Sequence, residues 1–187
     1  PKKSSQENPS PLLLLYSGVS GITILDRYLA KYFSHHGYSV VVSHYFDQTA
    51  NKEITNINQS MIEGVYANLA LVDYFSSLPT IDPAHIGSLG ISFGGIRAVY
   101  HSVLDTRVKA SILMVTGGPI NDIMAYSELE VMEELRKGHM QQAGISDLKQ
   151  YHELLSKQIT FKLADWTCRR SSEDYFMFLS QKDKYVP

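Results

Sequence analysis

A serine flanked by glycines stands in the stretch of the sequence that carries the clearest chemical signal. Gly90-Ile91-Ser92-Phe93-Gly94 follows an apolar segment and precedes a segment with helical periodicity. The glycines permit a sharp turn in which larger side chains would collide with neighbouring elements. A helix that begins just after the serine directs free N–H groups toward it, which suits an oxyanion. The pattern predicts a nucleophilic serine, and the alternative is a glycine-rich turn whose serine has no chemical role.

A carboxylate near the end of the chain is expected at the same edge of the fold. Asp183 stands at the carboxyl end of the strand-like segment 174–183, whereas Asp174 stands at its start. The carboxyl ends of parallel strands form one edge of a sheet, where ligands bind in open α/β folds. We therefore expect Asp183 to lie at the edge that carries Ser92. The alternative is a solvated turn residue between two lysines.

Apolar patterning divides the chain into alternating strands and helices. Strands are expected at 12–18, 38–46, 85–91, 108–118 and 174–183, and helices at 22–36, 60–77 and 93–104, with 120–160 mainly helical. This order predicts an α/β fold, a mostly parallel sheet with helices on both faces. The Pro/Ser-rich residues 1–11 are expected to form a flexible arm. Residues 12–187 would then be a single core, with 119–165 as a helical cap-like insertion.

Local signals refine two of these helices. Thr23 and Asp26 have the spacing of a capping box, and so have Ser60 and Glu63. An apolar stripe at helical spacing predicts the face that the first helix packs on the sheet; it consists of Leu25, Tyr28, Leu29, Tyr32 and Phe33.

Composition excludes several classes of partner. The formal net charge is −2 and no long basic cluster occurs, so neither nucleic acid nor an anionic membrane is expected as a partner. The apolar run Leu12–Leu15 is far too short to cross a bilayer. The single cysteine, Cys168, cannot form an internal disulfide, which favours a reducing compartment, and we expect a cytoplasmic protein. The sequence does not indicate an oligomeric state.

Two stretches resemble a known superfamily. SSLPTIDPAHIGSLGISFGG resembles the nucleophile region of the α/β-hydrolases, and most closely the dienelactone-hydrolase and prolyl-oligopeptidase-like serine esterase branch. FMFLSQKDKYVP is similar to the segment that supplies the acid of the catalytic triad in that branch. The resemblance implies the α/β-hydrolase fold, with Ser92 as nucleophile and Asp183 as acid.

The resemblance also implies an oxyanion hole. SGVSG (17–21) lies where the branch places its first oxyanion loop, although Tyr16-Ser17 stands where a histidine is usual. The implied donors are the backbone N–H groups of Phe93 and of Val19 or its neighbour. The alternative for 17–21 is a plain strand-to-helix turn.

The histidine that should activate Ser92 is not evident. The superfamily order is serine, acid, histidine, but only four residues follow Asp183 and none is histidine. Four histidines are expected out of reach, as surface or interface residues: His35, His36, His85 and His101. Three could approach the site, although nothing in their spacing fixes them there: His44, His139 and His152. We expect a chain truncated at both ends, with the histidine beyond Pro187; alternatively the protein is a non-catalytic relative.

These observations predict a serine hydrolase that cleaves a carboxylic ester or related acyl bond of a small molecule through an acyl-enzyme on Ser92. No metal and no cofactor are required. Peptidase and thioesterase activities use the same machinery, and the alternative from another class is a non-catalytic α/β-hydrolase relative with a binding or regulatory role. Tyr126 and Trp166 are further candidates for contact with substrate. Apolar residues of the insertion could line a pocket or simply pack: Ile120, Ile123, Met124, Tyr126, Met132 and Leu135.

Overall fold

The computed structural model describes residues 8–44, 53–162, 165, 169–183 and 185, and within them five strands form one parallel sheet. The strand order is β2-β1-β3-β4-β5. The strands are β1 (Ser10–Tyr16), β2 (Ser39–Ser43), β3 (Ile81–Ile91), β4 (Val108–Met114) and β5 (Tyr175–Phe178). All neighbouring strands run in the same direction, which brings their carboxyl ends to one edge.

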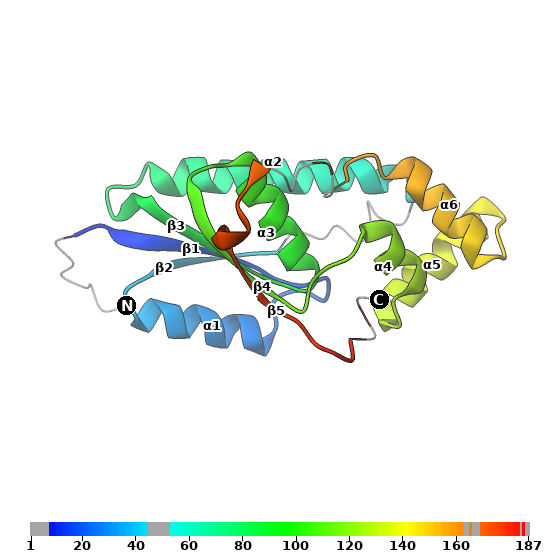
Figure 1. Cartoon of the computed structure of the whole chain (residues 1–187), viewed down its shortest axis with the longest axis horizontal. Helices are drawn as coiled ribbons and strands as arrows, with labels where there is room; N and C mark the ends of the chain where they lie inside the picture. Colours follow the sequence, from blue (N-terminus) through cyan, green and yellow to red (C-terminus); the bar gives the residue numbers. More distant parts are fainter. Residues whose placement is uncertain (1–7, 45–52, 163–164, 166–168, 184, 186–187) are drawn as a thin grey trace.

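Helices cover both faces of this sheet. Figure 1 shows α1 on one face, α2 and α3 on the other, and α4, α5 and α6 beyond one end of the strands. The helices are α1 (Ile24–His35), α2 (Ile57–Ser76), α3 (Phe93–Leu104), α4 (Ile120–Tyr126), α5 (Glu130–Ala143) and α6 (Leu148–Gln158). Short 3₁₀ turns, η2 (Ile54–Asn56) and η5 (Ser172–Asp174), precede α2 and β5. The predicted fold class is confirmed, and the predicted insertion corresponds to α4, α5 and α6.

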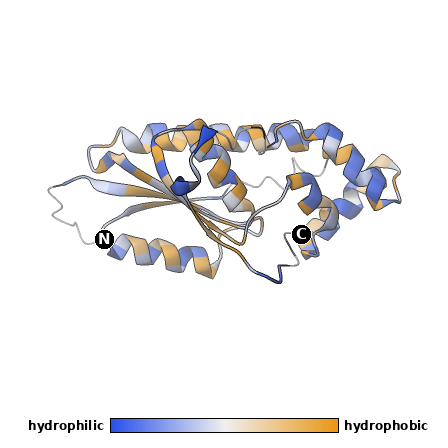
Figure 2. Cartoon of the chain, viewed as in Figure 1, coloured by the Kyte–Doolittle hydropathy of each residue, from blue (hydrophilic) through white to orange (hydrophobic). Residues whose placement is uncertain are grey.

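The interior strand β1 is apolar on both sides because both faces of the sheet are covered. Leu12, Leu14 and Tyr16 pack in the core under α2 and α3, while Leu13 and Leu15 pack in the core under α1. A strand in such a position reads as a continuous apolar run and not as an alternating one. The helices that cover the sheet carry both hydrophobic and hydrophilic residues (Figure 2).

Helix α1 begins as predicted but packs through a narrower face than predicted. Thr23 and Asp26 form the complete capping box. Leu29 and Phe33 pack against the sheet. The other members of the predicted stripe are exposed, because only the side of α1 that carries Leu29 and Phe33 packs on the sheet: Leu25, Tyr28 and Tyr32.

Several element boundaries differ from the sequence prediction: β3 begins at Ile81 and not at residue 85, β4 ends at Met114 and not at 118, and β5 ends at Phe178 and not at 183. β1 begins at Ser10, inside the stretch expected to be a flexible arm, because the Ser10 side chain bonds Ser39 and the carbonyl of Thr80. Helix α2 begins at Ile57, so Ser60 lies in its first turns and the predicted second capping box is wrong. The residue at the start of α2, Asn56, makes no side-chain cap.

His101 is buried, which corrects the prediction that it lies at a surface or interface. Helix α3 is buried from Gly94 to Val103, so this position faces the interior. Burial raises the pKa of Tyr16, so its hydroxyl keeps its proton, and this hydroxyl shares a hydrogen bond of 2.5 Å with Nδ1 of His101. Nε2 lies 3.7 Å from a carboxylate oxygen of Asp105.

The His101 pairing predicts acid sensitivity. Burial lowers the pKa of His101 to about 4, whereas an unfolded histidine titrates near 6.5. Between these values the unfolded chain binds a proton that the folded chain does not, so the free energy of unfolding falls as pH drops through this window. We expect the titration of His101 to lower the free energy of unfolding by about 3 kcal/mol between neutral pH and pH 4.

The variant His101→Gln tests this prediction, because glutamine keeps an acceptor for Tyr16 and does not titrate. Urea unfolding curves at neutral pH and near pH 4 should show a smaller acid loss in the variant than in the unsubstituted chain. Equal losses in the two proteins would contradict the assignment.

Candidate active site

The turn at Ser92 holds the serine in a backbone conformation that few residues adopt. Ser92 has φ 52° and ψ −121° and joins β3 to α3. Its N–H donates to the carbonyl of Met114 at 2.8 Å, and its carbonyl accepts from the N–H of Gly95 at 2.9 Å. The side chain makes no capping bond to α3, so the hydroxyl is not committed to the helix. Such backbone strain costs on the order of 1–3 kcal/mol and concentrates at functional sites.

Three glycines allow α3 to lie close to the strands at this turn. A Cβ on Gly94 would overlap the carbonyl oxygen of Tyr16, and a Cβ on Gly90 would overlap the backbone of Gly94. A Cβ on Gly95 would lie 2.5 Å from the Thr116 side chain. The steric reason for the glycines around the serine therefore holds at each of these positions.

The loop after β1 passes directly beside Ser92. A Cβ on Gly18 would lie 3.7 Å from Cβ of Ser92. The loop is anchored by a bond from Ser17 N–H to the carbonyl of Ser43, at 3.2 Å. Val19 and Phe93, the predicted oxyanion donors, thus belong to the two segments that border the serine. Their donation to an oxyanion stays a prediction.

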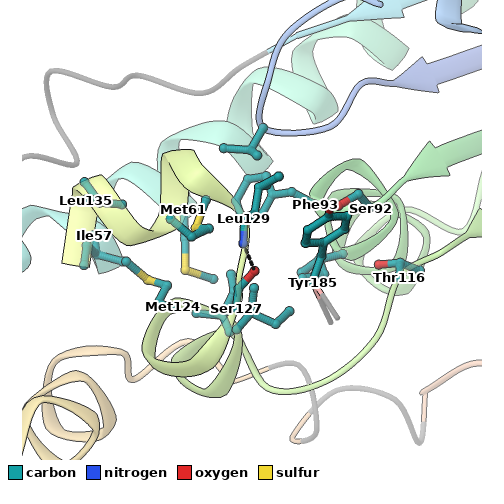
Figure 3. A pocket seen from close by; sticks show the side chains of 15 residues that line it. Ile57, Met61, Ser92, Phe93, Thr116, Met124, Ser127, Leu129, Leu135 and Tyr185 are labelled. Carbon is teal, nitrogen blue, oxygen red and sulfur yellow. Dashed lines mark hydrogen bonds between the residues drawn. The ribbon is translucent and has the colours of Figure 1, made fainter. Parts of the chain in front are cut away.

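Ser92 lies at one end of a narrow apolar pocket. Phe93 and Tyr185 lie beside the serine at this end, and the other end is formed by methionine and aliphatic side chains such as Met61, Met124 and Leu135 (Figure 3). Its cavity volume is about 40 Å³. The far walls come from α2, α4 and α5, through Ile57, Met61, Ile123, Met124, Met132 and Leu135.

A wider and more polar cleft opens on the other side of the same serine. This open cleft has a volume of about 540 Å³, and Ser92, Val19 and Tyr185 line both hollows. Polar side chains are gathered in its lining: Ser20, Thr23, Asp26, Ser180, Lys182 and Asp183.

The structure brings Asp183 to the edge of the sheet that carries Ser92, as the sequence suggested. Asp183 follows β5, and its side chain accepts from the N–H of Tyr185 at 2.9 Å, which fixes the carboxylate locally. Ser92 and Asp183 both line the open cleft. Their catalytic roles remain predictions.

A second strained residue borders the open cleft. Val115 has φ 45° and follows β4, and its N–H donates to the carbonyl of Phe178 at 2.7 Å. Positive φ is rare for a β-branched residue. Ser92 and Val115, the two non-glycine residues with positive φ in the described part of the chain, therefore both line this cleft.

Two of the three histidines left open by the sequence have partners away from Ser92. His139 is fully buried, with Nδ1 2.8 Å from the hydroxyl of Tyr151. Nε2 of His152 lies 2.6 Å from Asp122 in α4. His44 is exposed, and its Nε2 would lie 3.8 Å from a Cβ on Gly21. Within the described residues, no histidine lines the apolar pocket or the open cleft.

The other predicted contact residues are not brought to Ser92. Tyr126 lines neither hollow, because Ile120, Ile123 and Met124 form the inward face of α4 and Tyr126 stacks instead on His152. Trp166 and Cys168 lie outside the described residues. Five of the six apolar insertion residues do line the apolar pocket: Ile120, Ile123, Met124, Met132 and Leu135.

Sequence reasoning missed Asp26 and the contribution of α2 to the site. The spacing of Thr23 and Asp26 predicts only a helix cap, yet Asp26 also lines the open cleft. Ile57 and Met61 have the i, i+4 spacing of one helix face, a signal that predicts packing but not a pocket. Among the described residues no cluster of three or more His, Cys, Asp or Glu side chains could hold a metal ion, and no helix is both long and apolar enough to traverse a bilayer.

Comparison with solved structures defines the fold. An acetyl xylan esterase from Paenibacillus sp. R4 superposes with a TM-score of 0.69 at 15% identity, over 100% of this chain and 64% of that chain. The α/β hydrolase GrgF from Penicillium sp. sh18 superposes with a TM-score of 0.64 at 16% identity, over 97% of this chain and 75% of that chain. The chain therefore has the α/β-hydrolase fold.

Sequence comparison is consistent with this assignment but covers little of the chain. The curated protein "Putative hydrolase YtaP" of Bacillus subtilis (strain 168) is 35% identical over 48 residues. The match spans 26% of this chain and 16% of that protein. No protein-family model matches the sequence.

The close packing at the turn predicts that Gly94 cannot be replaced. Gly94→Ala places a methyl group into the backbone of β1 and should cost on the order of 3 kcal/mol or prevent folding. Gly138→Ala is the matched control in α5, since a Cβ there meets nothing within 4 Å. The control should be neutral or stabilising by up to about 1 kcal/mol. Thermal and urea unfolding measure both, and comparable effects in the two variants would contradict the proposed packing constraint.

Proposed function

We propose that this chain carries the nucleophile and acid of a serine hydrolase that cleaves a carboxylic ester or related acyl bond. The observation that carries the proposal is the position of Ser92. It stands in a strained turn at the N-terminus of α3, where an apolar pocket and an open cleft containing Asp183 meet. Similarity in fold to esterases supports the reaction class, because such sites recur on this fold.

The chemistry assigned to these residues follows from their positions. The Ser92 hydroxyl attacks the acyl carbon and passes its proton to an imidazole base, and the base returns a proton to the leaving alcohol. The oxyanion accepts hydrogen bonds from backbone N–H groups of Phe93 and Val19. Asp183 orients the base, and water then hydrolyses the acyl-enzyme.

The two hollows suggest where the parts of the substrate bind. The apolar pocket receives the acyl group, since its walls are methionine and aliphatic side chains. One water molecule needs a cavity of about 10–15 Å³. The cavity volume of about 40 Å³ therefore accommodates a short acyl chain of about three heavy atoms. The open cleft receives the alcohol part, because it is wider and carries the polar side chains.

A non-catalytic relative is the second candidate, and one observation favours it. No histidine of the described residues lines the hollows beside Ser92. Without a base the serine hydroxyl is a weak nucleophile. The two candidates differ in whether the remaining machinery responds when a base is supplied.

Added imidazole separates these two candidates. The chain should hydrolyse 4-nitrophenyl acetate slowly, and free imidazole should raise the rate beyond its own uncatalysed contribution if Ser92 is poised for attack. Ser92→Ala should abolish this increment, since loss of the nucleophile removes nearly all covalent catalysis, a factor of about 10⁶ in a well-studied serine protease. Stopped-flow absorbance and mass spectrometry of the acetylated chain measure both effects.

Histidine variants complete this experiment. If the chain is active without imidazole, His44→Ala shows whether the exposed histidine beside Gly21 supplies the base. His139→Ala and His152→Ala are the comparisons, because these side chains are engaged elsewhere. A rate that is the same in the unsubstituted chain and in Ser92→Ala, with and without imidazole, would refute the hydrolase proposal.

The narrow apolar pocket predicts a preference for short acyl groups. Met124 is buried and lines the pocket, so Met124→Ala should enlarge it and shift the preference from acetyl toward butyryl or hexanoyl esters. The ratio of rates for the 4-nitrophenyl esters is the measurement, with stability recorded in parallel because such a truncation costs about 2–5 kcal/mol. An unchanged chain-length ratio in a folded variant would argue against this pocket as the acyl site.

A further inference from the structure

One carboxylate in the open cleft has an oxygen without a partner. Asp26 is 1% exposed and lines the cleft on the side of α1. Its Oδ2 accepts from the N–H of Thr23 at 2.7 Å and from the hydroxyl of Thr23 at 2.5 Å. Its Oδ1 is buried and has no hydrogen-bond partner within the described part of the chain. The capping box therefore uses half of this side chain and leaves the other half unsatisfied.

An unsatisfied carboxylate oxygen in such a place is costly. A buried polar atom without a hydrogen bond loses roughly 1–3 kcal/mol, and more when it is charged. Structures retain such a group where it has a role, or where a bound molecule satisfies it. Asp26 is among the residues that line the open cleft, although its side chain is almost fully buried in the free chain.

We propose that Asp26 is a specificity-determining residue that binds a hydroxyl group on the alcohol part of the substrate. This inference rests on the proposed function, in which the open cleft beside Ser92 holds the alcohol. The hydroxyl donates to Oδ1 of Asp26, and the remaining polar groups of the cleft serve neighbouring hydroxyls. The substrate class is thus an ester of a polyhydroxylated alcohol, such as a sugar or glycerol unit.

The composition of the cleft favours a neutral polyol over a cation. Asp26 and Asp183 are acceptors, whereas Lys182 places a positive charge in the same lining. A hydroxyl-rich ring can donate to the carboxylates and accept from the lysine, and Ser20 and Ser180 add hydroxyls that can do either. An ammonium ion would be attracted by the two carboxylates but repelled by the charge of Lys182.

Asp26→Asn is the decisive variant. The amide oxygen of Asn can take over both bonds to Thr23, which turns the NH₂ group toward the position of the unpartnered oxygen. The cap is preserved while an acceptor in the cleft becomes a donor. Asp147→Asn is the matched control, because Asp147 also caps a helix with its side chain, at α6, and does not line the cleft.

Binding of three six-membered rings tests the proposal without requiring turnover. The probes are methyl β-xylopyranoside, 2-methoxytetrahydropyran as the same ring without free hydroxyls, and piperidinium as a cation, each titrated into the chain and followed by NMR. We expect the xyloside to bind and the ring without hydroxyls to bind much more weakly. Asp26→Asn should weaken xyloside binding roughly ten- to hundredfold, the loss of a hydrogen bond to a charged group. Asp147→Asn should leave it unchanged.

Three outcomes of these titrations would overturn the proposal. Equal xyloside affinity in the Asp26→Asn variant would show that Asp26 does not bind the hydroxyl, and preferential binding of piperidinium would assign the cleft to a cation. Loss of affinity in the Asp147→Asn variant as well would indicate a general effect of helix capping. The titrations measure binding and the imidazole experiment measures turnover, so the hydrolase proposal can fail while the Asp26 proposal stands, and the Asp26 proposal can fail while the hydrolase proposal stands.

Discussion

The close approach of α3 to the ends of β1 and β3 is the constraint on which the site depends. Gly94 lies against the carbonyl of Tyr16, and Gly95 lies against Thr116. Because backbone meets backbone here, the turn between β3 and α3 has no room to relax, and Ser92 is held at positive φ. The same approach brings the loop that follows β1 beside the serine. Packing of a helix on a sheet thereby fixes the groups that border Ser92.

Buried polar contacts hold the end of β1 in this position. The guanidinium of Arg97 in α3 lies 5.2 Å from the centre of the Tyr16 ring and donates to Asn68 in α2 at 2.9 Å and to Ser43 in β2 at 3.1 Å. The Tyr16 hydroxyl is bound in turn to His101. A network of this kind is stabilising only when its geometry is satisfied, and it therefore ties two helices and two strands to one arrangement. Displacement of Tyr16 would move the loop that begins at Ser17.

The fold was predictable because its signals are local. The apolar run in β1, the capping box at Thr23 and the glycines around Ser92 each have one simple structural interpretation, and all agree. The placement of Asp183 was predictable because parallel strands end at the same edge. The burial of His101 and the unpartnered oxygen of Asp26 were not, since both depend on contacts between segments distant in the sequence. The false cap at Ser60 shows that spacing alone cannot locate a helix start.

The difference between the two hollows has its origin in the elements that form them. The apolar pocket is closed by helices, whose inward residues recur at i, i+3 and i+4 and are apolar because those faces also form the core between α2 and α4. The open cleft is bordered mainly by loops at the carboxyl ends of strands, where backbone polar groups and turn residues such as Ser180 and Asp183 must stay hydrated. A serine at the boundary of these two environments meets one apolar and one polar side. A molecule that joins a short apolar chain to a hydroxylated group through one carbonyl therefore matches this boundary better than a uniformly apolar ester.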